Sequence, residues 1–174
     1  GMENMSLAPH LLQQRFAPKN GPVTLVDSLF NDGLTDAYSQ DAMGITAENI
    51  VEKYGFTREE QDAFAVASQQ KAAKTQAEGR FASEITPVAV FNRKTKSDDL
   101  KVTDEFIRPN TNLESLAGLK PSFKKDGTVT AGNASGINDG AACVIMTTRE
   151  YATELGLPIL ATLKGYAEAG VDPS

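Results

Sequence analysis

The sequence predicts a mixed α/β fold in two parts that meet near residue 137. Three Thr-x-x-Glu segments, beginning at Thr57, Thr111 and Thr147, have the pattern of a helix-starting capping box. Short runs of β-branched and aromatic residues between turn-forming residues indicate strands. Before residue 137 these elements alternate with long loops. After it a strand, a helix and a strand follow in succession, which is typical of a layered α/β domain.

Composition narrows the class of protein. The 174 residues carry 17 Lys and Arg against 23 Asp and Glu, a net charge of −6 without a basic block, which argues against a nucleic acid partner. No apolar run approaches the ~18 residues of a membrane span, and no secretory signal is visible. One cysteine and one histidine exclude an internal disulfide and leave too few ligands for a zinc site. We therefore expect a cytoplasmic protein with no membrane partner and no metal.

The stretch His10–Pro22 is predicted to be a loop. Proline and glycine at four positions interrupt regular structure between residues 9 and 22. Val23–Leu29 is a short apolar run, and Asn31-Asp32-Gly33 has turn chemistry. This part of the chain has too many apolar side chains for a free loop, which predicts packing on another surface, for example a neighbouring subunit: Leu7, Leu11, Leu12 and Phe16.

Two helices are expected next. The first runs over Met43–Tyr54 and stops at Gly55. The second begins after the N-cap Thr57, with Glu60 at N3, and runs to about Glu78. Its alanine-rich stripe allows close packing around one large anchor, Phe64. Glu59, Glu60 and Asp62 complement the helix dipole.

The region after the long helix is expected to contain a strand at Ile85–Phe91, a polar turn, and a possible return strand at Leu100–Thr103. A short helix from the Thr111 box to about Gly118 follows. The Thr147 box opens a helix that ends at Gly156, and Ile159–Tyr166 is predicted to be a strand.

Thr128–Met146 is the stretch around which the chain is organised. Glycine at 132, 136 and 140 permits close approach of the backbone to another surface, with short polar side chains between. One interpretation is a tight turn between two core strands. The other is a wall against which a polar ligand or a second domain is pressed. The spacing is not Gly-x-Gly-x-x-Gly, so a dinucleotide fingerprint is absent.

Neither potentially reactive side chain looks catalytic. Cys143 lies within Ala-Ala-Cys-Val-Ile-Met and is predicted to be buried in a strand and inert. His10 has no second histidine or paired carboxylate near it in sequence, which disfavours a general-base role. The residues alone thus indicate no nucleophile–base pair.

Thr130–Ala142, Thr-Ala-Gly-Asn-Ala-Ser-Gly-Ile-Asn-Asp-Gly-Ala-Ala, resembles a segment of the thiolases, specifically those of the acetoacetyl-CoA type. The resemblance runs from Gly-Met-Glu-Asn-Met-Ser at 1–6 to Gly-Val-Asp-Pro at 170–173. It implies a partial thiolase-like fold: residues 1–137 correspond to the loop domain that covers coenzyme A, and 138–174 to the end of the N-terminal catalytic domain and the start of the C-terminal domain.

The resemblance also implies an acyltransferase reaction, in which two acetyl-CoA molecules give acetoacetyl-CoA and free coenzyme A. Coenzyme A is then a substrate, and no permanent cofactor is expected. The family's acylated cysteine is expected before residue 1. Its Asn-Glu-Ala-Phe segment, Gly-His-Pro histidine and second reactive cysteine are expected after residue 174. No catalytic residue is therefore expected in this chain. Its partners would be acetyl-CoA, acetoacetyl-CoA, the remaining thiolase domains and further copies in a dimer or tetramer.

Individual positions match coenzyme-binding positions of the family. Phe-Ile-Arg-Pro resembles the segment whose arginine, here Arg108, contacts the adenosine-phosphate end of coenzyme A; from sequence it is placed at a strand end, where a surface salt bridge is the alternative. Met43 matches a methionine near the acyl group. The remaining matches are Ser115, Phe123, Ala131 and Ser135 as coenzyme contacts, and Leu34 and Ile137 as apolar members of the pocket.

One departure from the family pattern is Ala42 in Ala42-Met43-Gly44, where acetoacetyl-CoA thiolases commonly have histidine. It leaves open a longer-chain 3-ketoacyl-CoA thiolase. An alternative of another class is a coenzyme-binding or oligomerisation module without catalysis.

Overall fold

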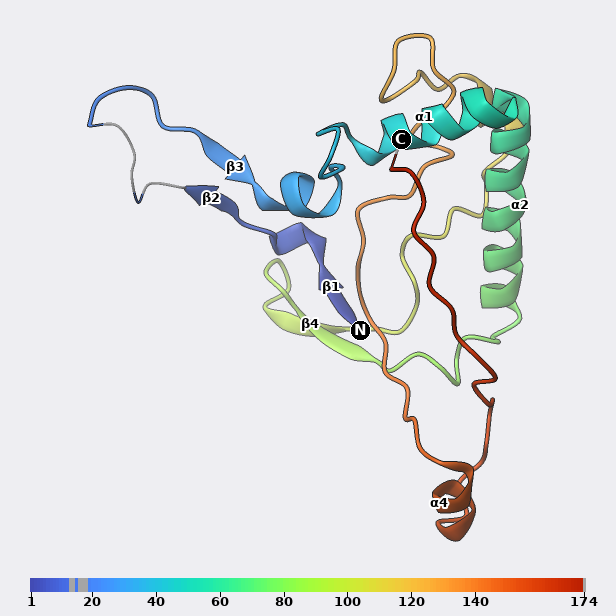
Figure 1. Cartoon of the computed structure of the whole chain (residues 1–174). Coiled ribbons are helices and arrows are strands. Elements are labelled where there is room, and N and C mark those ends of the chain that lie inside the picture. The colour runs from blue at the N-terminus through green and yellow to red at the C-terminus, as the bar shows by residue number, and fades with distance from the viewer. Residues whose placement is uncertain (13–14, 16–18, 174) are drawn as a thin grey trace. The chain divides into compact units, whose positions relative to one another are not determined.

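The structure, a computed structural model, describes residues 1–12, 15 and 19–173 (Figure 1). The chain divides into two units. Unit 1 comprises Gly1–Gln40 together with Ile137–Ser174, and unit 2 is the continuous segment Asp41–Gly136. The two ends of the chain thus form one unit, and the segment between them forms the other.

Two short strands join the ends of the chain in unit 1. Strand β1 (Met2–Asn4) pairs antiparallel with β6 (Asp139–Ala141), so that Met2 lies opposite Ala141. The backbone N–H of Ser6 donates to Asp139 Oδ1 at 2.9 Å. This contact continues the pairing beyond the strand, into the 3₁₀ turn η1 (Met5–Leu7).

A second antiparallel pair in unit 1 is formed by β2 (His10–Leu12) and β3 (Leu25–Asp27), with His10 opposite Asp27. The apolar run predicted at 23–29 therefore contains a three-residue strand. The predicted turn at 31–33 belongs to the π-helix η2 (Leu29–Gly33). Among the apolar residues predicted to pack on a neighbour, three are exposed, Leu7, Leu11 and Leu12. Phe16 lies outside the described residues.

The last part of unit 1 contains helix α4 (Arg149–Glu154), which ends before Gly156 with φ +65° as predicted. Its N-cap is Thr148, whose hydroxyl accepts the N–H of Tyr151 at 3.2 Å, one residue later than the predicted Thr147. The strand predicted at Ile159–Tyr166 is wrong for this chain, because that segment has no strand pairing. A strand needs a neighbour to receive its hydrogen bonds, and none of the described residues supplies one.

The prediction that Cys143 is buried in a strand is also wrong. Strand β6 stops at Ala141, and Cys143 is exposed. Its apolar neighbours Val144, Ile145 and Met146 are 81%, 88% and 77% exposed. The run has the composition of an interior strand, but the described chain provides no layer to cover it.

We expect Cys143 in this chain to react with a disulfide reagent at nearly the same rate in buffer and in urea, within about a factor of three, because accessibility governs labelling of a thiol without an activating partner. Stopped-flow absorbance measures both rates. The Cys143→Ser variant is the blank, since the chain has one cysteine. Labelling that is fast in urea alone would contradict the exposed position.

Unit 2 begins with two helices whose limits follow the predicted signals. Helix α1 (Met43–Tyr54) ends at Gly55, which adopts φ +72° and donates to Val51 O at 2.8 Å. Helix α2 (Arg58–Ala77) begins with the predicted box: Glu60 N–H donates to Thr57 Oγ1 at 3.1 Å, and Thr57 N–H donates to Glu60 Oε2 at 2.8 Å. The prediction that Phe64 anchors the packing of this helix is wrong, since its side chain is 78% exposed.

The predicted strand and return strand of unit 2 form a hairpin. Strand β4 (Val88–Asn92) pairs with β5 (Ser97–Lys101), with Asn92 opposite Ser97. The return strand starts earlier than predicted. Asn92 Oδ1 accepts the N–H of Lys94 at 2.9 Å, which stabilises a turn directly after β4. Strand pairing therefore begins again at Ser97, after four turn residues.

The third helix of unit 2, α3 (Leu113–Ala117), starts one residue later than the predicted box. Its N-cap is Asn112, whose Oδ1 accepts the N–H of Ser115 at 2.9 Å. Thr111 does not cap the helix, because its hydroxyl donates to Arg108 O at 2.8 Å and closes the preceding turn.

Candidate functional site

The centre of unit 2 is built largely from polar groups. Its buried residues are Glu48 at 2% exposure, Asp62 at 4% and Thr130 at 0%, together with Leu116 and Val129. Polar groups without partners are costly to bury, so their hydrogen bonds decide the local structure. These bonds hold the Thr128–Gly136 part of the stretch singled out in the sequence.

Glu48 on α1 receives three hydrogen bonds from that stretch. Its Oε1 accepts the backbone N–H groups of Thr128 and Val129, both at 2.8 Å, and its Oε2 accepts the Thr128 hydroxyl at 3.1 Å. Burial alone would raise the pKa of this carboxyl. The donors from Val129 and Thr128, together with the charge of Lys124, outweigh burial and lower the pKa below its ordinary value.

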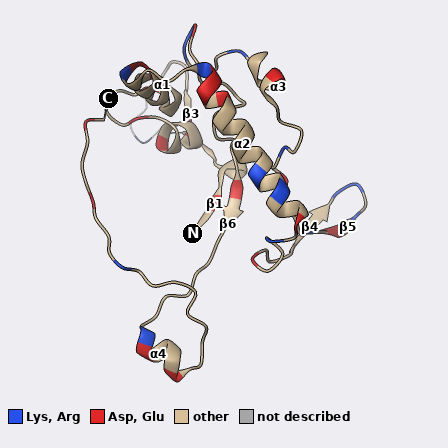
Figure 2. Ribbon diagram, turned by 90° about the vertical axis from the view of Figure 1, so that its right-hand side faces the viewer, with Lys and Arg blue, Asp and Glu red and all other residues tan. Residues whose placement is uncertain are grey.

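Asp62 on α2 anchors the other side of the stretch. Its Oδ2 accepts Arg58 Nε at 2.8 Å, and its Oδ1 accepts Asn133 Nδ2 at 3.0 Å. Arg58 Nη2 also donates to Leu116 O at 2.6 Å, which ties α3 to the start of α2. The sequence interpretation of Asp62 as a dipole partner is therefore incomplete, whereas Glu59 and Glu60 do lie in the first turn of α2. Figure 2 shows acidic residues in red at that end of the helix.

Close backbone approach is confirmed at two of the three predicted glycines. A Cβ on Gly132 would lie 2.5 Å from Leu116 Cδ2, and one on Gly136 would lie 2.4 Å from Phe106 Cε2. At Gly140 the prediction is wrong, because nothing lies within 4 Å of the same position. The predicted turn is present at 131–133, but two core strands do not flank it; an isolated bridge joins Thr130 to Pro121.

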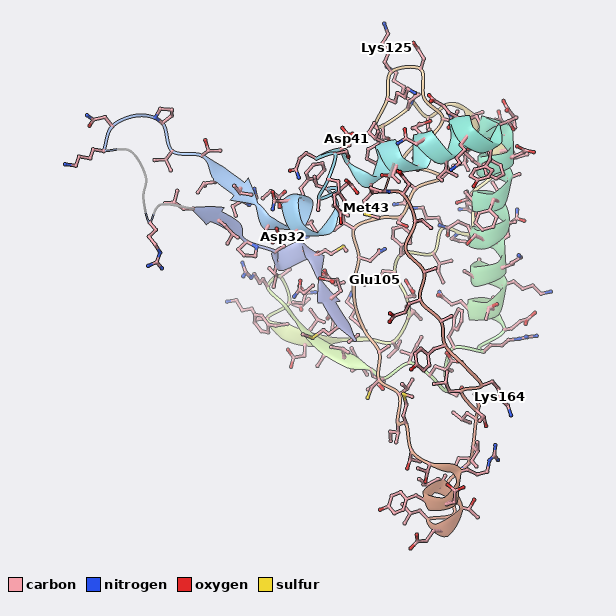
Figure 3. The ribbon with its side chains drawn as sticks, in the orientation of Figure 1. Asp32, Asp41, Met43, Glu105, Lys125 and Lys164 are labelled. Atoms are coloured by element: carbon pink, nitrogen blue, oxygen red, sulfur yellow. The ribbon has the colours of Figure 1, made fainter. Side chains whose placement is uncertain are left out.

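Six of the eight predicted coenzyme contacts lie in unit 2. Met43 is the first residue of α1 and is 58% exposed; Figure 3 shows its side chain at the start of that helix. Ser115 is at N3 of α3 and is exposed, with its hydroxyl donating to Asn112 O at 2.8 Å. Phe123 is 40% exposed. Ala131 and Ser135 are exposed in the turn region of the central stretch.

Arg108 does not follow a strand, which corrects its predicted place. β5 ends at Lys101, and Arg108 lies in a loop, where its N–H donates to Gln69 Oε1 at 2.8 Å. Its carbonyl accepts the N–H of Thr111 at 3.2 Å across a turn that contains Pro109. The guanidinium is exposed and forms no ion pair within the described chain.

The remaining two predicted residues lie in unit 1. Leu34 follows the π-helix η2, is half-buried, and donates its N–H to Phe30 O at 3.2 Å. Ile137 is 61% exposed at the start of the second segment of the unit. All eight assignments stay predictions.

The family model of the thiolase N-terminal domain matches residues 1–150. The chain belongs to the thiolase family. It is 55% identical over 176 aligned residues to a probable acetyl-CoA acyltransferase of Staphylococcus aureus strain NCTC 8325 / PS 47, covering all of this chain and 44% of that protein. The thiolase chain therefore spans less than half the length of this curated relative.

Solved structures show the same fold. The crystal structure of the Bacillus anthracis acetyl-CoA acetyltransferase matches with a TM-score of 0.93 and 43% identity, over 99% of this chain and 43% of that one. The human mitochondrial 3-ketoacyl-CoA thiolase in complex with CoA matches with a TM-score of 0.80 and 41% identity, over 91% and 39%. The predicted partial thiolase-like α/β fold is thereby confirmed.

Sequence reasoning missed the residues that organise the centre of this thiolase unit: Glu48, Arg58 and Asn133. One signal was available for Glu48. It lies three residues after Ile45 and three before Val51, in the apolar edge of α1. A carboxylate in an apolar helix stripe indicates a buried acceptor. Arg58 has a local signal as well, because Asp62 follows it by four residues on the same helix. Asn133 has none, because its partner Asp62 is 71 residues away.

Across the residues that the structure describes, no helix has the length and apolarity needed to cross a membrane. Within the same residues, no group of three or more His, Cys, Asp or Glu side chains is arranged to hold a metal ion.

The lowered pKa of Glu48 predicts a contribution to acid unfolding. A carboxyl whose folded pKa is below its unfolded value stabilises the folded state fully above the unfolded value, here ordinarily 4.5. That contribution is lost as pH falls through the folded pKa. We expect Glu48→Gln to lower the urea midpoint at neutral pH and to reduce the fall in stability as the pH drops below about 4.5. Circular dichroism measures both. The exposed Glu59→Gln is the matched control; identical acid profiles for the parent and Glu48→Gln would contradict the expectation.

Proposed function

We propose that this chain supplies coenzyme A-binding surface to an acetyl-CoA acetyltransferase. The parent enzyme joins two acetyl-CoA molecules into acetoacetyl-CoA and free coenzyme A, and runs in reverse by thiolysis. Coenzyme A acts as substrate and not as a permanent cofactor. The observation that carries the proposal is the match to the Bacillus anthracis acetyl-CoA acetyltransferase over 99% of this chain.

The positions of the matched residues are compatible with this role. Arg108 has an exposed guanidinium without an ion-pair partner in the described chain, which suits phosphate binding. Met43 and Phe123 are exposed apolar side chains near the start of α1, a suitable surface for the acyl end of the substrate. The thiolase solved with CoA supports coenzyme A as the ligand.

The proposal includes the division of roles along the chain. Residues 1–137 form the loop domain over coenzyme A, and 138–174 end the N-terminal domain and begin the C-terminal one. The parent is a cytoplasmic homo-oligomer, a dimer or tetramer, in which the remaining thiolase domains supply the catalytic cysteines and histidine.

A longer-chain 3-ketoacyl-CoA thiolase is the second candidate. Ala42 favours it, since acetoacetyl-CoA thiolases commonly have histidine there, and the match to the human mitochondrial 3-ketoacyl-CoA thiolase is nearly as high in identity, 41% against 43%. Thiolysis rates of the parent enzyme with acetoacetyl-CoA and with longer 3-ketoacyl-CoA esters separate the two. A coenzyme-binding or oligomerisation module would show no thiolysis in any assembly.

The isolated chain is expected to have no thiolase activity. Its one cysteine, Cys143, does not match a reactive cysteine of the family, and its one histidine, His10, takes part in none of the ion pairs of the described residues. Spectrophotometric cleavage of acetoacetyl-CoA by the purified chain and by the parent enzyme checks this. Activity in the parent but not in the chain agrees with the proposal. Cleavage by the chain alone, or none by the parent, would refute it.

A further inference from the structure

One face of α1 contacts a single segment of unit 2. Gly44, Glu48 and Glu52 are spaced by four residues and therefore share a helix face. Gly44 lies under the ring of Phe123, since a Cβ there would be 2.2 Å from Phe123 Cγ. Glu52 pairs with Lys124, and Glu48 accepts the Thr128 and Val129 amides. We call Gly44, Glu48 and Glu52 the α1 contact face.

The Glu48 contact has the geometry of a built anchor. Thr128 and Val129 are consecutive, and both of their N–H groups point to one carboxylate oxygen, whereas successive N–H groups in a regular strand alternate in direction. Val129 is 6% exposed, so water has little access to replace the acceptor. Gly127 makes room for the carboxylate, because a Cβ on it would lie 2.4 Å from Glu48 Oε1.

Two short backbone connections lead from this anchor to predicted coenzyme contacts. Ser122 N–H donates to Val129 O at 2.9 Å, and this bond fixes the position of Ser122, which directly precedes Phe123. Thr130 directly precedes Ala131. Its N–H donates to Asn133 Oδ1 at 2.7 Å, and its carbonyl accepts the N–H of Ala134 at 3.0 Å. Phe123 is thus linked through Ser122 to Val129, and the turn from Ala131 to Ser135 is linked through Thr130, the residue that follows Val129.

We propose that Glu48 is a positioning residue for coenzyme A, which fixes Phe123 and the 131–135 turn through the amides of Thr128 and Val129 without touching the ligand. This inference rests on the proposed function for its ligand, and on the geometry of unit 2 for its mechanism. Replacing the carboxylate with a neutral amide weakens the bonds to both backbone donors, because a charged acceptor binds N–H groups more strongly than a neutral one, and the segment is then held less firmly. Movement of that segment displaces both sets of coenzyme contacts.

The test uses the parent enzyme with Glu48→Gln, Gly127→Ala and the control Glu59→Gln. Gly127→Ala keeps every charge but occupies the carboxylate's place. We expect the first two variants to raise the Kd for coenzyme A roughly tenfold, with kcat for thiolysis changed less than KM, and Glu59→Gln to stay within about twofold of the parent. In isotopically labelled 174-residue chain, Glu48→Gln should also shift the Thr128 and Val129 amide proton resonances upfield.

The outcomes separate this inference from the proposed function. Unchanged coenzyme A affinity in folded Glu48→Gln and Gly127→Ala, alongside an Arg108→Ala variant that binds weakly, overturns positioning by Glu48 and leaves the coenzyme site standing. If the parent enzyme itself does not bind coenzyme A, both the inference about Glu48 and the proposed function are refuted. If Glu48→Gln does not fold, Gly127→Ala and Glu48→Asp decide. Normal affinity in both overturns the inference, and weakened affinity in both with an unchanged unfolding temperature supports it.

Discussion

Replacing Arg108 with alanine is expected to weaken coenzyme A binding by the parent thiolase by about ten- to a hundredfold. Coenzyme A carries several phosphate charges and this chain has a net charge of −6, so binding needs a local cation. The guanidinium of Arg108 is exposed, and its backbone is fixed by Gln69 and by the turn to Thr111. A fixed backbone with an unengaged planar donor suits phosphate oxygens.

Calorimetry at two ionic strengths measures this effect, which should shrink as salt rises because mobile ions screen the phosphate contact. Arg93→Ala is the matched control: Arg93 is exposed in the turn of the β4–β5 hairpin and should leave the Kd unchanged. Dephospho-coenzyme A tests which phosphate is involved. Parent-like affinity of Arg108→Ala at low salt would show that Arg108 is a surface residue outside the site. Ser135→Ala should cost less than Arg108→Ala, since a neutral hydroxyl contributes only about 1 kcal/mol.

Asp62→Ala is expected to lower the free energy of unfolding of unit 2 by about 3 kcal/mol, because removing one partner of a buried pair leaves the other charge uncompensated. The Asp62 side chain is 6% exposed and that of Arg58 is 19% exposed. Asn133 loses a hydrogen-bond acceptor in the same step. Urea unfolding followed by circular dichroism at 222 nm measures the change, since α1, α2 and α3 all belong to unit 2.

Two further variants locate the origin of that loss. Glu59→Ala removes an exposed acidic residue three positions earlier on the same helix and should change stability by less than about 0.5 kcal/mol. Arg58→Met with Asp62→Ala removes both charges, and a double-mutant cycle should show strong coupling between them. Additive losses would mean that the two side chains act independently, contrary to their 2.8 Å contact.

Helix limits in this chain are predictable because their signals are local. The α2 helix begins at a capping box formed by Thr57 and Glu60, and helices end near glycines with positive φ at positions 55, 79 and 156. Each signal lies within a few residues of the helix end that it sets. The α3 boundary shows the limit of a local pattern. Thr111 fits the capping box as well as Asn112 does, but its hydroxyl closes the preceding turn.

Elements that depend on distant partners were predicted less well. Ile159–Tyr166 and the run around Cys143 have the composition of interior strands, yet a strand is defined by its neighbour, and the described chain supplies none there. Phe64 fails as an anchor for the same reason, since nothing in the described chain covers it. Apolar composition reports what a segment prefers to contact, not whether the contact is present in this part of the protein.

In the candidate site, too, some residues were predictable from the sequence and others depend on distant partners. Resemblance to the thiolases supplied positions such as Met43 and Phe123, and these stay predictions for binding. The burial of Glu48 has a local signal, but its donors could be found only in three dimensions, because they lie 80 and 81 residues further along the chain. No periodic pattern connects positions so far apart.

The arrangement of the two units also bears on how the chain reaches its native state. Unit 2 is one continuous segment, whereas β1 must find β6 across more than 130 residues before unit 1 is complete. Closing so long a loop is entropically unfavourable and slows folding, but prior compaction of the intervening segment shortens the effective search. During synthesis, β1 leaves the ribosome long before its partner exists. Unit 2 is therefore placed to fold before β1 pairs with β6.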